Sequence, residues 1–98
     1  MAIAGKYQVV VASPDGNIDA VIELAESGGA YSGTLKAQGN NAVFRDLKVD
    51  GDNFASAVTI NYDMDTFNAT IKGAVDGDAL SGVINTPYMP VSYKGKRV

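Results

Sequence analysis

The sequence contains no cysteine, no histidine and no tryptophan among its 98 residues. Without cysteine the chain has no disulfide bond, no thiolate metal ligand and no thiol nucleophile. Without histidine it lacks the side chain that most often acts as a general base, and a Ser-His-Asp triad is impossible. We therefore expect a protein that is not an enzyme, the alternative being chemistry based on tyrosine or carboxylate side chains. A domain without disulfides must be held together by its core, which suits a cytoplasmic protein.

Long apolar runs and clustered positive charge are also missing. No stretch approaches the roughly 20 apolar residues of a membrane-spanning helix, and the N-terminus lacks the charged leader and apolar segment of a signal peptide. The net charge is −3, and we interpret the basic cluster at 94–97 as a solvated terminal strand. We expect neither nucleic acid nor a membrane as a partner, because phosphate binding requires clustered lysine and arginine.

The sequence does contain a regular series of turn signals, and one four-residue motif occurs twice. Residues 49–52 and 75–78 both read Val-Asp-Gly-Asp. Asp-Gly between stretches of alternating polarity predicts a β-hairpin, whose type I′ turn needs the positive φ that glycine tolerates. Similar signals place turns at 13–16, 26–29, 39–41, 50–51, 62–65, 76–77 and 85–87. These turns separate eight predicted strands within a single domain that spans residues 1–98.

Between the turns, apolar or small residues alternate with polar ones. The pattern is clearest at 7–11, 18–24, 54–62 and 67–75. Alternation of this kind predicts strands with one buried and one solvated face. The sequence therefore predicts an all-β protein, an antiparallel eight-stranded up-and-down meander closed into a small barrel. A β-sandwich of two packed sheets is the alternative.

The alternation breaks in the fourth predicted strand. Val43 and Phe44 are both apolar, and the pattern resumes at Leu47 and Val49. A β-bulge near Arg45 would return the later apolar residues to the face of Phe44, because one extra residue shifts the phase of the strand. Without a bulge, Arg45 would point into the core, so the bulge is the preferred interpretation.

Six short motifs follow one another in a characteristic order. They are Gly5-Lys6-Tyr7, Pro14-Asp15-Gly16, Tyr31-Ser32-Gly33, Val49-Asp50-Gly51-Asp52, Leu80-Ser81-Gly82 and Gly95-Lys96-Arg97. In this order they resemble small calycin-like (lipocalin-like) domains, although Tyr31 replaces a leucine and the first strand has no tryptophan. The resemblance covers nearly the whole chain. It implies a small β-barrel without defined chemistry, of a kind found alone or appended to bacterial enzymes.

Aromatic residues form the first candidate binding site. Those on predicted inward faces or in the last strand are Tyr7, Tyr31, Phe54, Tyr62, Phe67 and Tyr93. They either fill the core, as aromatic side chains do in small domains, or line a barrel mouth that binds a small apolar ligand. A second candidate is the loop made of Pro87, Tyr88, Met89 and Pro90. This loop either caps the barrel end or exposes a contact surface for another protein.

The carboxylates do not form a metal-binding motif. Asn61, Asp63 and Asp65 are spaced like the first ligands of a calcium loop, but the required glycine and glutamate further along are absent. The aspartates of the two Val-Asp-Gly-Asp motifs are typical turn residues. We therefore expect no metal and no cofactor.

Taken together, these patterns favour a non-catalytic accessory or interaction domain of unknown specific function. Its partner would be another protein domain. The alternative is a binder of a small apolar ligand in the barrel interior. We expect a monomer or a homodimer, and no residue pattern decides between the two.

Overall fold

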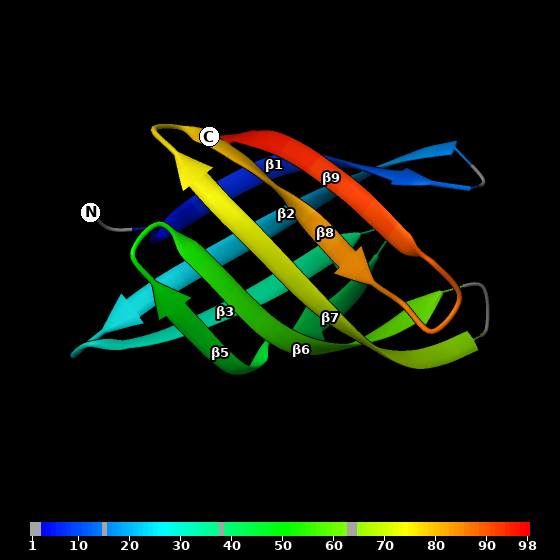
Figure 1. The fold of residues 1–98 in the computed structure, drawn as a ribbon, viewed down its shortest axis with the longest axis horizontal. Coiled ribbons are helices and arrows are strands. Elements are labelled where there is room, and N and C mark those ends of the chain that lie inside the picture. Colours follow the sequence, from blue (N-terminus) through cyan, green and yellow to red (C-terminus); the bar gives the residue numbers. More distant parts are fainter. Residues whose placement is uncertain (1–2, 15, 38, 63–64) are drawn as a thin grey trace.

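The described residues of this computed structural model, 3–14, 16–37, 39–62 and 65–98, form nine antiparallel strands in one curled sheet (Figure 1). Nothing is described of the side chains of Asn40 and Tyr62. The strands are β1 (Gly5–Ser13), β2 (Gly16–Ser27), β3 (Ala30–Ala37), β4 (Asn40–Val43), β5 (Arg45–Asp50), β6 (Asn53–Tyr62), β7 (Asp65–Asp76), β8 (Ala79–Asn85) and β9 (Pro90–Arg97). Their order across the sheet is β4-β3-β2-β1-β9-β8-β7-β6-β5.

This order confirms the predicted up-and-down barrel and not the alternative sandwich. Strands that follow one another pair as hairpins, except β4 and β5, which are the two edges of the sheet. The first strand, β1, pairs with the last, β9, and this pairing joins the two halves of the chain into one sheet. Each predicted turn joins two paired strands, although Asp15, Asp63 and Met64, in two of those turns, lie outside the described residues. No helix in the described part of the chain is long and apolar enough to cross a membrane.

The two Val-Asp-Gly-Asp hairpins differ in one detail from the prediction. Their loops are centred on Gly-Asp rather than Asp-Gly, since Asp50 pairs with Asn53. Gly51 and Gly77 take the first central position with φ of 63° and 64°. Glycine at that position is typical of a type II′ turn. Turns of type II′ and of the predicted type I′ are both compatible with the right-handed twist of the flanking strands.

The strand count exceeds the prediction because the fourth predicted strand is split at Phe44. β4 pairs with β3 whereas β5 pairs with β6, so the chain leaves one edge of the sheet and joins the other. The amide of Phe44 donates a hydrogen bond to the carbonyl oxygen of Gly33 at 2.9 Å. The barrel is therefore nearly closed between its two edge strands, β4 and β5, where the chain passes from one edge to the other.

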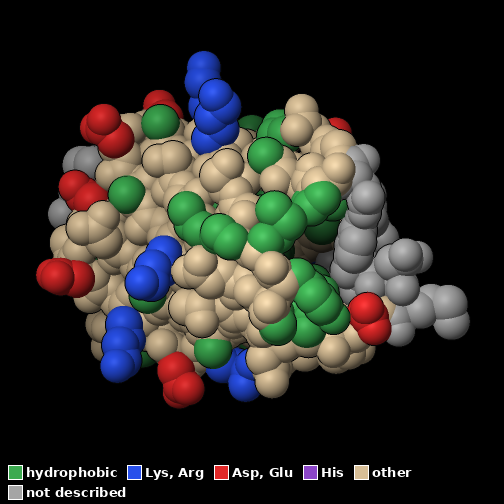
Figure 2. Space-filling view, turned by 45° about the vertical axis from the view of Figure 1, so that its right-hand side comes forward, with side chains coloured by type: hydrophobic (Ala, Val, Ile, Leu, Met, Phe, Trp, Pro, Cys, Tyr) green, Lys and Arg blue, Asp and Glu red, His purple; other side chains and the backbone are tan. Residues whose placement is uncertain are grey.

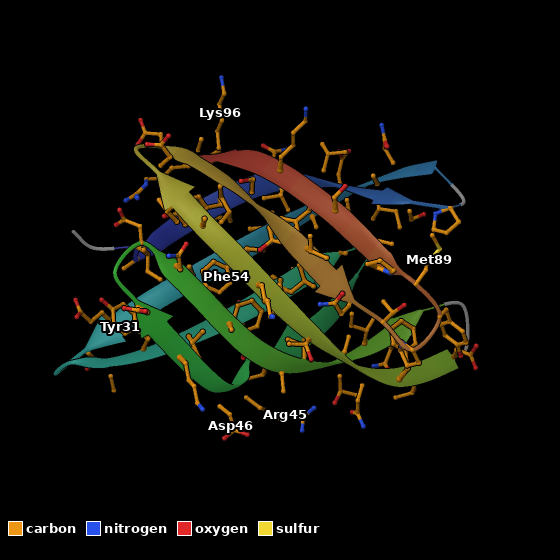
Figure 3. The ribbon with its side chains drawn as sticks, in the orientation of Figure 1. Tyr31, Arg45, Asp46, Phe54, Met89 and Lys96 are labelled. Carbon is orange, nitrogen blue, oxygen red and sulfur yellow. The ribbon has the colours of Figure 1, made fainter. Side chains whose placement is uncertain are left out.

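The predicted bulge near Arg45 is confirmed. The register of the β5–β6 ladder shifts between Arg45 and Lys48, and Asp46 between them has a φ of 53°. Arg45 and Asp46 point away from the barrel (Figure 3). Because of the extra residue, Leu47 and Val49 pack against the core.

One end of the barrel is closed by the segment before β1. The side chain of Ile3 is fully buried, and the hydroxyl of Tyr7 donates a hydrogen bond to the carbonyl oxygen of Ile3 at 2.7 Å. Arg97 donates to the carbonyl oxygen of Ala4 at 3.1 Å and to the Tyr7 hydroxyl at 2.9 Å. Its guanidinium lies 5.1 Å from the centroid of the Tyr7 ring, within cation–π distance. Burial raises the pKa of Tyr7, and the charge of Arg97 opposes this.

The middle of the barrel is filled by a ring that lies over two glycines. Gly82 pairs with Gly73 on one side and with Tyr93 on the other. A Cβ atom at Gly73 or Gly82 would lie 2.5 or 2.7 Å from the Tyr93 hydroxyl. That hydroxyl donates a hydrogen bond to the carbonyl oxygen of Lys72 at 2.8 Å. The glycines thus make room for the tyrosine ring, whose burial raises the pKa of Tyr93.

We expect alkaline pH to weaken the fold through Tyr93. An unfolded tyrosine loses its proton near pH 10, whereas buried Tyr93 keeps it, so the stability contributed by the neutral hydroxyl is full below about pH 10 and falls above it. The slope is about 1.4 kcal/mol per pH unit for one tyrosine. Urea unfolding at neutral and rising pH measures it.

Tyr93→Phe is the control for this pH dependence. It is less stable than the wild type at neutral pH, since it lacks the hydrogen bond to Lys72, but its stability falls less steeply above pH 10. Some slope remains in the variant because the pKa of Tyr7 is raised as well. Parallel curves for the two proteins would contradict the assignment to Tyr93.

Candidate ligand-binding site

A cavity of about 390 Å³ opens at the end of the barrel opposite Ile3 and Arg97. Its apolar wall consists of Val11, Ile18, Ala20, Leu35, Ala37, Ala42, Ile60, Phe67, Ile84 and Val91. Its rim consists of Ser13, Pro14, Asn41, Asn61, Asp65, Thr86, Tyr88 and Met89. Figure 2 brings this end forward and shows hydrophobic side chains gathered across the face. The site is therefore an apolar pocket with a partly polar mouth.

Small side chains explain why the cavity lies at this end. Ala20 and Ala37 pair directly across β2 and β3, and both line the wall together with Ala42. A barrel of about eight strands has an interior that ordinary side chains roughly fill. Alanine side chains at three inward positions are too small to fill the interior at this end, so a cavity remains. At the closed half the inward glycines have the opposite effect, because the rings of Phe54 and Tyr93 occupy their space.

The loop between β8 and β9 forms part of the mouth. The Thr86 hydroxyl donates a hydrogen bond to the carbonyl oxygen of Met89 at 2.7 Å and accepts one from the Met89 amide at 3.0 Å. The side chains of Tyr88 and Met89 line the cavity while remaining 72% and 46% exposed. The Tyr88 ring meets the Phe67 ring edge-to-face, with centroids 5.6 Å apart. Two apolar side chains are thus held at the entrance, and Figure 3 shows Met89 there.

The structure separates the aromatic candidates between the two halves. Tyr7, Phe54 and Tyr93 are almost fully buried in the packed part of the barrel and do not line the cavity. Phe67 is half-buried and lines the cavity wall. Aromatic side chains therefore fill one half of the barrel and border a cavity in the other.

The remaining candidates lie elsewhere. Tyr31 is partly buried at the closed end, where desolvation and Glu26 raise its pKa. The Tyr62 side chain lies outside the described part of the structure. Of the candidate loop, Tyr88 and Met89 border the cavity, whereas Pro87 and Pro90 are absent from its lining.

Sequence reasoning missed most of the cavity wall, which is aliphatic rather than aromatic. The available signal was the position of the inward alanines. Ala20, Ala37 and Ala42 all lie within a few residues of turns that end up at one end of the barrel. Small inward residues gathered near the turns of one end indicate unfilled space there.

The acidic residues that the structure describes do not gather into a metal-binding cluster. Within 3–14, 16–37, 39–62 and 65–98, no group of three or more acidic, histidine or cysteine side chains is placed to hold a metal ion. The two Val-Asp-Gly-Asp turns lie together at the closed end (Figure 1). Of the aspartates in the calcium-loop comparison, Asp63 is outside the described residues and Asp65 lies on the cavity rim.

Comparison with known proteins defines the class by its fold. No protein-family model and no curated protein matches the chain. A solved structure of a redesigned β-barrel is similar, with a TM-score of 0.69 and 13% sequence identity over 98% of this chain and 91% of that one. At this identity the similarity concerns the fold alone. The chain is an antiparallel β-barrel protein with a cavity at one end.

Proposed function

We propose that the barrel binds a small, largely apolar molecule in this cavity. The observation that carries the proposal is an apolar pocket of about 390 Å³ inside a barrel whose other half is tightly packed. Pockets of roughly 300 to 1,000 Å³ are the usual size of small-molecule sites. An apolar protein cavity of about 150 Å³ already binds benzene, so this cavity fits a larger ligand than one ring. Binding needs no catalytic group, in line with a non-enzymatic protein.

The closed end supports a calycin-like form of this barrel. Tyr7 belongs to the first motif of the resemblance and Arg97 to the last. At the closed end the Arg97 guanidinium packs over the Tyr7 ring and donates a hydrogen bond to its hydroxyl. The first and last strands thus contribute side chains that close one end of the barrel. The cavity at the opposite end is where a ligand would enter.

A non-catalytic interaction domain is the second candidate function. It is favoured by the exposure of Tyr88 and Met89 in a hydrogen-bonded loop, which offers a preformed apolar contact to another protein domain or to a second copy. Native mass spectrometry distinguishes the two functions. A bound small mass on the monomer supports the ligand binder, whereas an unliganded homodimer supports the interaction domain.

Filling the cavity should abolish binding without unfolding the protein. We expect Ala42→Phe to lower the affinity for N-phenylnaphthylamine, a neutral dye that fluoresces in apolar sites, by about tenfold or more. The added ring occupies existing space, so stability should stay the same or rise by about 1 kcal/mol. Fluorescence titration and urea unfolding measure the two effects.

Ala25→Phe is the matched control. Ala25 is exposed on the outer side of β2 and does not line the cavity, so this variant should bind the dye as the wild type does. Equal dye binding by Ala42→Phe and the wild type would show that the dye binds elsewhere. A wild-type protein that neither binds the dye nor retains any small molecule would overturn the proposed function.

A further inference from the structure

The described residues at the cavity mouth carry charge of one sign. Among the described lining residues the single ionisable carboxylate is that of Asp65, and none is lysine or arginine. Asp65 begins β7, and Phe67 follows it on the same face of the strand, because side chains alternate along a strand. The Asp65 side chain therefore lies at the entrance, on the same face of β7 as the aromatic side chain of Phe67.

Two aromatic rings line the same cavity as this carboxylate. The Phe67 and Tyr88 rings meet at an interplanar angle of 86°, and both line the cavity. Tyr88 as a residue is 72% exposed, so it is accessible to a ligand at the mouth. Aromatic faces attract cations that approach within about 6 Å of the ring centroid. A carboxylate and two perpendicular rings that line one cavity are a combination suited to organic cations.

No lysine or arginine is among the described residues that line the cavity. Lys6, Lys96 and Arg97 lie near the closed end, where β1 begins and β9 ends, and Figure 3 labels Lys96 there. Lys94 lies further along β9, opposite Val10, and Lys36, opposite the rim residue Asn41, is exposed and does not line the cavity. An anionic headgroup at the cavity mouth would meet Asp65 with no cation among the described lining residues to compensate it. The electrostatics of the mouth thus disfavour fatty acids and similar carboxylates.

We infer that the ligand is a cationic amphiphile, with an apolar body in the cavity and an amino or quaternary ammonium group at Asp65, Phe67 and Tyr88. This inference rests on the proposed function and names its ligand class. The aliphatic wall takes the apolar body, and the mouth selects the charge of the headgroup. Asp65 is accordingly a specificity-determining residue, and the affinity for the apolar body does not depend on it.

Three probes with the same alkyl chain test the inference. Octyltrimethylammonium, octanol and octanoate are titrated calorimetrically into the wild-type protein below their micellar concentrations at neutral pH. We expect octyltrimethylammonium to bind about tenfold or more tightly than octanoate, because attraction of one headgroup and repulsion of the other by Asp65 combine. Octanol reports the contribution of the chain alone.

Asp65→Asn should reduce the affinity for octyltrimethylammonium about threefold to fivefold, as expected for a solvent-exposed ion pair. The same variant should bind octanol unchanged and octanoate more tightly. Glu23→Gln, which removes a carboxylate from the outer face of β2, is the matched control and should leave all three affinities unchanged. Tyr88→Leu, which keeps an apolar side chain at the mouth, should weaken only the ammonium probe.

The outcomes separate the inference from the function on which it rests. Equal binding of all three probes, or tighter binding of octanoate, overturns the cationic ligand class while the apolar binding function stands. A parallel loss of all three affinities in Asp65→Asn also overturns it, because a structural effect would not discriminate between headgroups. If neither the three probes nor N-phenylnaphthylamine binds, the proposed function itself is wrong.

Discussion

Replacing Gly82 or Gly95 by alanine is expected to lower the free energy of unfolding by about 3 kcal/mol or more, although only one methyl group is added. A Cβ atom at Gly82 would overlap the carbonyl oxygen of Lys72, and one at Gly95 would overlap that of Gln8. The overlapping oxygen atoms belong to the backbone of neighbouring strands. The steric overlap can therefore be removed only if the hydrogen-bonded strands move apart. For a domain of this size, such a loss is a large share of total stability.

Gly77→Ala is the control for this prediction. Gly77 has a φ of 64°, which strains any other residue, but a Cβ atom there would meet nothing within 4 Å. Its cost should therefore be only about 1 kcal/mol. Urea unfolding of the three variants measures the difference. If Gly82→Ala and Gly95→Ala were no less stable than Gly77→Ala, the close approach of the strands would be wrong.

Truncating Phe54 and truncating Phe67 should have very different consequences. Phe54 is 3% exposed, and its ring stacks on that of Phe44 with centroids 6.2 Å apart. It also occupies the space in front of Gly73. Phe54→Ala should therefore cost about 3 to 5 kcal/mol, the range seen when a large buried side chain leaves a cavity. Phe67 already borders empty space, so Phe67→Ala should cost only about 1 to 2 kcal/mol.

Ligand binding should depend more on Phe67 than on Phe54, the reverse of their effects on stability. Phe67→Ala removes part of the cavity wall and should change the affinity for N-phenylnaphthylamine, whereas the folded fraction of a Phe54 variant should bind it normally. Phe54→Leu, a milder substitution, keeps the comparison possible if Phe54→Ala does not fold. Urea unfolding and dye titration measure both properties. Equal stability losses for the two alanine variants would contradict a barrel with one packed and one open half.

The strands and turns could be predicted because their causes are local. The alternation in 18–24 and 67–75 assigns each side chain to a face, and glycine in a turn signals a positive φ within one or two residues. Even the bulge at Arg45 was visible as a break in that alternation. The split at Phe44 was not visible, because consecutive strands β4 and β5 become the two opposite edges of the sheet only when the whole sheet curls.

Candidate site residues were harder to predict than strands. Tyr93 and Phe54 have the same inward alternation as Phe67, yet the first two are core and the third lines a cavity. What separates them is their partners across the barrel. Tyr93 lies over Gly82 and bonds to the backbone of Lys72, contacts between residues far apart in sequence.

By itself the sequence determined which residues face inward, where the chain turns and that the sheet is antiparallel. These follow from the two-residue period of a strand and from the backbone preferences of glycine and proline. Only the tertiary structure decided how far along the barrel each inward residue lies. That depth depends on the register of eight ladders together, and it is what gathers Ala20, Ala37 and Ala42 around a cavity and brings Arg97 onto Tyr7 at the closed end.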